Sequence, residues 1–334
     1  MAEIALYHPL IDPDDSALLK TAALYWDGLR TIVPESMDDP YQGRDSAEAF
    51  REGFLKPRYV SSESPEVVKA STEFASDVGS PAIRAETRRA RRAAGLHGGG
   101  VASLHPQKLS SHLREAFFSR LPASEDGFRR VAEGFATAYL SRLAAVVAEG
   151  DHLSPLTNIQ TCQDVVVDRH AENVAIGSGQ AAEGELARLT LQTISIRPDA
   201  PLVTVLRFRD NHRDELARFR RRIRQLCRSL TKPDPVERLH DELPALVRDE
   251  IQPGTDELRA KLREHGVAFG VSALDVVQAT TIGLMGSGLN DWIRGIAGGV
   301  LSLAFSAWRA RRERQRLLDE SPLSYLLTAQ SQLE

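Results

Sequence analysis

Residues 266–308 carry only three charges, at Asp275, Asp291 and Arg294, in a chain in which 26% of the residues are charged. A membrane-spanning helix needs about 20 mainly apolar residues, and the charge-free windows 276–290 and 295–308 are both shorter than that. Two pairs of glycines at i and i+4 would let helices approach closely: Gly266, Gly270, Gly295 and Gly299. The stretch therefore predicts a buried helical hairpin. An oligomer interface and a hairpin that leaves the core to enter a membrane are the alternatives.

The start of the chain, up to Pro34, switches between strand and helix patterns. The segment "EIALYHP" is typical of a short strand, and the apolar residues of 18–29 then recur at helical spacing. Asp14, Asp15 or Ser16 would cap this helix. A second extended segment follows, so the sequence predicts a small α/β unit at the start of the chain. Residues 34–63 contain many prolines and glycines and are predicted to be mainly loop.

Most of the remaining chain has helical patterns. We expect helices over 64–79, 80–95 and 125–150, and an almost entirely helical region from 211 onward. The segment 186–208 is rich in β-branched residues around a Pro-Asp-Ala-Pro turn, which predicts a central β-hairpin. The predicted fold class is α+β, predominantly α-helical. Two domains, 1–185 and 186–334, are expected, with one continuous fold as the alternative.

The segment 206–230 combines a narrow apolar stripe with many arginines. Leu216, Phe219, Ile223 and Leu226 recur at a spacing of three or four, which predicts an amphipathic helix capped by Asn211. Its candidate anion-binding residues are Arg213, Arg218, Arg220, Arg221, Arg222, Arg224 and Arg228. They could contact phosphates, which would give salt-dependent binding. The alternative is that they pair with the acidic N-terminal segment 1–80, or are simply solvated.

The best candidate for catalysis or metal binding is the segment "CQDVVVDRH" at 162–170. Asp164 and Asp168 would share one face of a helix, and His170 lies close by, so the three could hold a hard cation. The alternative is a polar surface segment above buried valines. No Walker loop, dinucleotide-binding glycine motif or G-x-S-x-G elbow occurs. No cofactor is therefore indicated.

Charge and cysteine content limit the choice of partner and compartment. The net charge is −4, which gives no overall basic field for a polyanion. The two cysteines, Cys162 and Cys227, do not form a disulfide framework, and no signal-peptide pattern opens the sequence, so a cytoplasmic protein is expected. The sequence favours an interaction or assembly protein over an enzyme. A protein partner or a second copy of the chain is expected, and nucleic acid is the alternative partner.

Three segments together resemble a bacterial family of unknown function. They are "IALYHPLIDPDDSALLKTAALYWDGLRTIVP", "LRFRDNHRDELARFRRRIRQL" and "SPLSYLLTAQ". The resemblance carries no known activity or cofactor, and it implies an accessory role in anti-phage defence. It directs attention to Tyr7, His8, Tyr25, Trp26, Asp27 and Pro34.

Overall fold

The structure is a computed structural model. It describes residues 3–77, 101–118, 127–158, 180–194, 196–197, 199–229, 243–264 and 321–333. The candidate metal ligands Asp164, Asp168 and His170 lie outside these residues, as do Gly266, Gly270, Gly295 and Gly299 of the predicted apolar hairpin. No helix in the described part of the chain is both long and apolar enough to cross a membrane.

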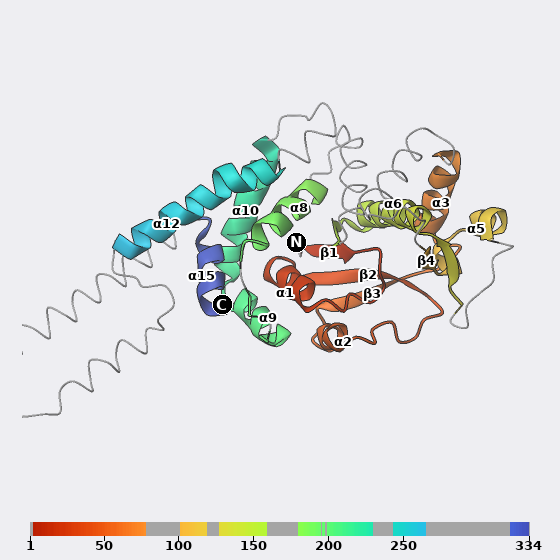
Figure 1. The fold of residues 1–334 in the computed structure, drawn as a ribbon, viewed down its shortest axis with the longest axis horizontal. Helices are drawn as coiled ribbons and strands as arrows, with labels where there is room; N and C mark the ends of the chain where they lie inside the picture. Colours follow the sequence, from red (N-terminus) through yellow and green to blue (C-terminus); the bar gives the residue numbers. More distant parts are fainter. Residues whose placement is uncertain are drawn as a thin grey trace, which may run out of the picture.

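A four-stranded parallel sheet is the centre of the fold (Figure 1). Its strands lie in the order β3 (Leu55–Val60), β2 (Gly28–Pro34), β1 (Ile4–Tyr7) and β6 (Ser154–Leu156). Helices α1 (Ser16–Tyr25) and α2 (Arg44–Arg51) connect β1 to β2 and β2 to β3. The chain then returns past β1 to add β6 on the other side of it, so the strand order reverses between β1 and β6.

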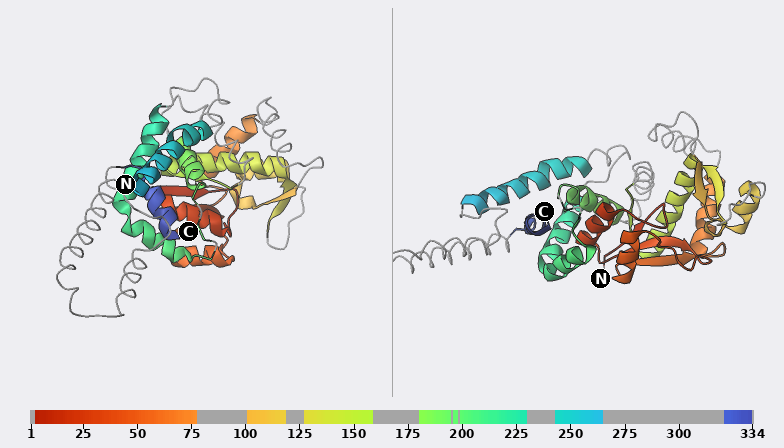
Figure 2. Two further views of the ribbon diagram at one scale, coloured as in Figure 1. Left: turned by 60° about the vertical axis from the view of Figure 1, so that its left-hand side comes forward. Right: turned by 60° about the horizontal axis from the view of Figure 1, so that its bottom comes forward.

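Alternating side chains of β1 pack into two different cores. Ala5 and Tyr7 belong to a cluster with α1 and with α8 (Gln180–Leu191), α9 (Leu202–Asn211), α10 (Arg213–Ser229) and α15 (Ser324–Leu333). Leu6 instead belongs to a cluster with α3 (Pro65–Asp77), α5 (Ser111–Phe118) and α6 (Glu133–Asp151). Helices thus cover both faces of the sheet, as expected for parallel strands. Figure 2 shows that α3 and α6 lie together, away from α9, α10 and α15.

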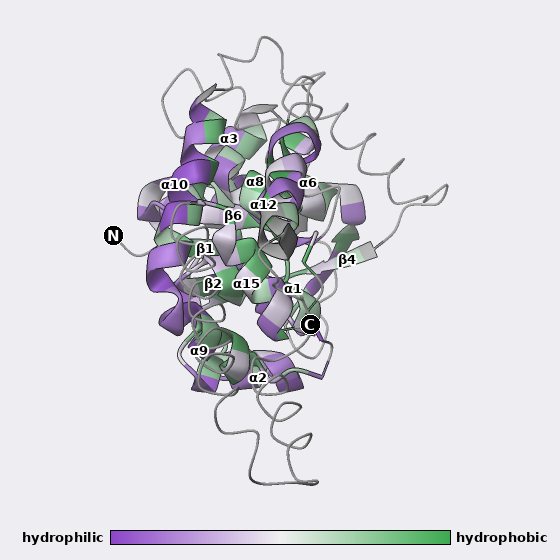
Figure 3. Cartoon of the chain, turned by 90° about the vertical axis from the view of Figure 1, so that its left-hand side faces the viewer, coloured by the Kyte–Doolittle hydropathy of each residue, from purple (hydrophilic) through white to green (hydrophobic). Residues whose placement is uncertain are grey.

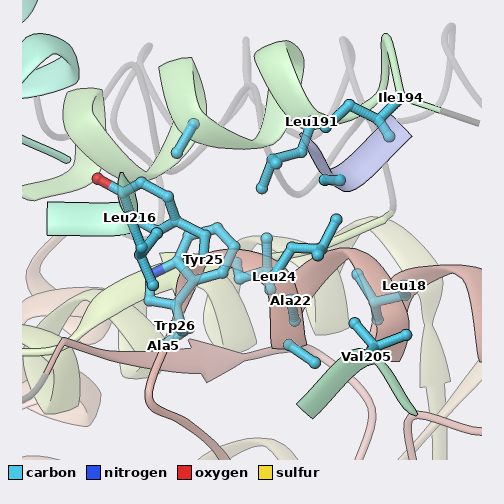
Figure 4. Close-up of a cluster of buried hydrophobic side chains, with 14 of the residues drawn as sticks. Ala5, Leu18, Ala22, Leu24, Tyr25, Trp26, Leu191, Ile194, Val205 and Leu216 are labelled. Carbon is cyan, nitrogen blue, oxygen red and sulfur yellow. The ribbon is translucent and has the colours of Figure 1, made fainter. Parts of the chain in front are cut away.

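The first cluster is built around Trp26, which is fully buried where α1 ends. The Tyr25 ring meets the Trp26 ring edge to face at 4.9 Å between centroids and the Phe219 ring of α10 at 5.9 Å. Figure 4 shows Leu191 and Ile194 above this group and Val205 beside Leu18. Tyr25 and Trp26 are therefore core residues, and the hydrophobic core joins the first strand to the helices that follow residue 180.

The predicted α/β start, the helix 64–79 and the mainly helical α+β class are confirmed. Asp15 caps α1, since its carboxylate accepts the Leu18 N–H at 3.0 Å. The prediction of loop over 34–63 was wrong, because these residues include α2 and β3.

The predicted hairpin over 186–208 was also wrong, because this segment contributes to α8 and α9. Leu202, Val205 and Leu206 are buried at helical spacing, and packing against α1 overrides their preference for strands. The antiparallel hairpin lies elsewhere, between β4 (Val101–Leu104) and β5 (Arg129–Ala132). β5 therefore occupies the start of the predicted helix 125–150. Asn211 ends α9 and does not cap α10.

Candidate functional site

Helix α10 presents its arginines to three different environments, and in Figure 3 it is mainly hydrophilic. Its apolar residues Leu216, Phe219 and Ile223 are buried, as the stripe in the sequence predicts. The arginines on the flanks of that stripe reach the N-terminal acids, line an open hollow or lie on the exposed surface. The helix thus divides its charge between its own protein and solvent.

Arg220 and Arg224 bind the acidic start of the chain. Arg220 donates two hydrogen bonds to the Tyr25 carbonyl oxygen, and its guanidinium lies 3.1 Å from Asp27 and 3.2 Å from Glu3. The Arg224 guanidinium lies 3.1 Å from the other Glu3 oxygen. We call Glu3, Asp27, Arg220 and Arg224 the N-terminal clamp. For these two arginines, the contacts match the expectation that they pair with the acidic N-terminal segment.

The pKa values of the two carboxylates in the clamp are shifted in opposite directions. Burial raises the pKa of Glu3, and the nearby guanidinium groups of Arg220 and Arg224 offset only part of the rise. Burial also acts to raise the pKa of Asp27. There, however, the hydrogen bonds from Arg220 and the Glu3 N–H outweigh burial and hold the pKa below its usual value. Asp27 therefore stays ionised to a lower pH than Glu3 does.

Arg218, Arg221 and Arg222 line a hollow of about 690 Å³, which we call the α10 hollow. Its opposite wall comes from α12 (Gln252–Glu264) and from residues 321–323 just before α15. Glu250 and Glu257 also line the hollow, and Arg222 lies 3.2 Å from Glu250. Its charged lining is thus three arginines and two glutamates, and its volume is within the usual range of small-ligand sites, roughly 300–1,000 Å³.

The other predicted arginines do not line the hollow. Arg213 is exposed and lies 3.3 Å from Asp210, and Arg228 is exposed. The structure therefore separates the seven predicted residues into the clamp, the hollow and the open surface.

A second group of polar residues lies at the carboxyl ends of the strands, close to the reversal of strand order. His8 follows β1, is 2% exposed, and donates its backbone N–H to Leu156 at the end of β6. Tyr7 donates from its hydroxyl to Asn158 at 3.0 Å, and Asn158 donates to Asp15 at 2.9 Å. Open parallel sheets bind ligands at this edge, where the strand order reverses.

The segment 105–110 lies against the end of β2 and buries Lys108. Gln107 accepts hydrogen bonds from the Ser36 N–H and hydroxyl, just beyond β2. The carbonyl oxygen of Lys108 accepts from the Tyr139 hydroxyl of α6, and Ser110 donates its N–H to Ser71 of α3. Because Tyr139 and Ser71 are buried and hydrogen-bonded to each other, the backbone at Lys108 is firmly held.

Lys108 and His8 are both buried, and the positive charge of Lys108 acts on the His8 ring. Burial lowers the pKa of Lys108 to about 7. Burial is also the main reason why the pKa of His8 is lowered to about 4. The carbonyl groups of Leu156 and Leu6 act to raise this pKa, and the positive charge of Lys108 lowers it further. Neither nitrogen of the His8 ring forms a hydrogen bond of normal geometry. We call this pair, with the strand ends around it, the sheet-edge site.

The sequence indicated His8 through a family resemblance, but it gave no signal for Lys108 or Asn158. Both belong to segments without a recognisable motif, and their positions depend on contacts with residues far away in the chain. Within the described residues, no group of histidine, cysteine, aspartate and glutamate side chains could hold a metal ion. The thiol of Cys227 is half-buried, and burial raises its pKa to about 12.

Fold and sites together define a mainly helical α+β protein with a small parallel sheet covered on both faces. A model of a family of unknown function (DUF6236) matches residues 43–334, and the chain belongs to this family. The suspected membership of an unknown-function family is therefore confirmed. No curated protein and no solved structure matches the chain.

Proposed function

We propose that the protein acts by assembly with a partner, and that the α10 hollow receives the phosphate groups of a nucleic acid. The observation that carries this proposal is the separation of the arginines on α10. Arg220 and Arg224 pair with Glu3 and Asp27, whereas Arg218, Arg221 and the Glu250-paired Arg222 line an open hollow.

The composition of the hollow favours contact with phosphates over contact with bases. Its lining contains no aromatic side chain among the described residues, so it offers no surface on which bases could stack. Arginine binds phosphate through two parallel N–H groups. The two glutamates reduce the local positive charge, which favours a moderate affinity. Each phosphate that an arginine neutralises makes the binding depend on salt.

The test is the binding of a fluorescein-labelled single-stranded oligonucleotide, measured by anisotropy over a range of salt concentrations. Arg221→Ala removes one charge from the hollow, and Arg213→Ala removes one charge from the same helix outside it. We expect Arg221→Ala to weaken binding several-fold and to reduce the salt slope by about 0.7 for one lost contact. Arg213→Ala should bind like the unchanged protein.

Equal losses in the two variants would show diffuse attraction to α10 and would contradict a site in the hollow. Absence of binding at low salt would contradict a nucleic-acid partner altogether. A protein partner or a second copy of the chain would then become the leading expectation, which light scattering and affinity capture would test. The role in anti-phage defence that the family resemblance implies stays a prediction.

A further inference from the structure

The sheet-edge site contains two buried groups that the fold itself does not use. None of the hydrogen bonds or ion pairs among the described residues involves the Lys108 amine, although Lys108 is only 3% exposed. A buried ammonium without a partner is strongly unfavourable. By contrast, the half-buried Arg58 is paired with both Glu66 and Asp151. Lys108 is therefore not placed as a structural ion-pair partner.

The acids near this edge are already engaged in capping helices. Asp14 accepts the Asp45 N–H in the first turn of α2, and Asp12 accepts the Gln42 and Gly43 N–H groups just before it. Asp15 caps α1. The N-termini of α1 and α2, where a phosphate would otherwise bind, are thus occupied by carboxylates that repel anions. A neutral ligand fits this edge better than an anionic one.

We propose that Lys108 is a nucleophilic amine that holds a small aldehyde or ketone as an imine, with His8 carrying the proton. A lysine activated by desolvation is an established route to such adducts. The site lies where the strand order reverses, which is the usual position for a ligand in an open parallel sheet. This inference does not depend on the α10 hollow.

The chemistry balances without an oxidant or a reductant. The Lys108 nitrogen attacks the carbonyl carbon, a C–N bond forms, and the C=O π electrons move to the oxygen. One nitrogen of the neutral His8 ring accepts the proton lost by the amine, and the ring returns a proton to the oxygen to give a carbinolamine. Loss of that hydroxyl as water then leaves the imine, and hydrolysis reverses the sequence.

The test is reductive alkylation of the full chain with propionaldehyde and sodium cyanoborohydride at pH 7, followed by peptide mapping. The chain has only six lysines, of which Lys56 and Lys69 are exposed. At pH 7 an ordinary lysine is neutral in only about one molecule in 3,000. We expect Lys108 to be modified at least tenfold faster than Lys56 or Lys69. Faster modification of the exposed lysines, with Lys108 spared, would overturn the proposal.

Two further measurements separate the site from simple exposure of an amine. His8→Gln should slow the modification of Lys108 several-fold while Lys56 reacts at its original rate. Labelling of Lys108 should not accelerate in urea below the unfolding transition, and acceleration there would mean that the amine reacts only after opening. Arg221→Ala should leave the labelling unchanged, so failure of this inference is distinguishable from failure of the α10 hollow.

Discussion

Replacing Lys108 by methionine is expected to stabilise the protein and to remove part of its pH dependence. Methionine keeps the unbranched apolar chain and eliminates the buried amine. Burial lowers the pKa of Lys108 from 10.5 to about 7, so between these pH values the unfolded chain binds a proton that the folded chain releases. Stability then rises with pH by as much as about 1.4 kcal/mol per unit. The amine thus destabilises the fold most below pH 7 and hardly at all above pH 10.5.

From these two pKa values, the advantage of Lys108→Met should be about 4 kcal/mol at pH 7 and about 2 kcal/mol at pH 9. Urea denaturation of both proteins at pH 6, 7, 8 and 9, followed by tryptophan fluorescence, to which the buried Trp26 contributes, measures this difference. Other titrating groups, including Cys227, are present in both proteins and cancel in the comparison. A constant difference across this pH range would refute the argument that the amine is buried without a partner. So would a variant less stable than the parent.

Three other substitutions test the supports of the two sites, each by urea denaturation. Tyr139→Phe should lower the free energy of unfolding by about 1–3 kcal/mol, because the Lys108 carbonyl and Ser71 lose a buried partner. An unchanged free energy of unfolding would mean that water replaces the hydroxyl. Arg220→Met should cost about 3 kcal/mol, because two carboxylates and a carbonyl lose their donor. Arg213→Met is its exposed control, and its cost should stay within about 0.5 kcal/mol, as for ordinary surface substitutions. Asp15→Ala should cost about 1 kcal/mol through loss of the α1 cap, and a neutral result would remove Asp15 from that role.

Local patterns in the sequence were sufficient to predict those helices and strands whose residues depend mainly on their neighbours in the chain. The strand at Ile4–Tyr7, the α1 helix with its capping aspartate and the apolar stripe of α10 all follow from short-range periodicity. The prediction of a hairpin over 186–208 failed because the β-branched residues of this segment also fit a helix when Leu202 and Val205 pack against α1. Strand propensity mainly reflects such surroundings, which a single segment does not contain.

The sites could be predicted only where their residues lie close together in the sequence. The seven arginines of α10 are visible in the sequence, but their separation depends on Glu3 and Asp27, which lie near the opposite end of the chain and share no motif with α10. Lys108 was even less predictable from the sequence, because its low pKa depends on burial. That burial depends on hydrogen bonds from Ser36 to Gln107 and from Tyr139 to the Lys108 carbonyl oxygen. The same lysine in an exposed loop would be an ordinary surface charge. The protonation of Lys108 therefore depends on what the fold places around it, and the pH dependence of Lys108→Met measures that environment directly.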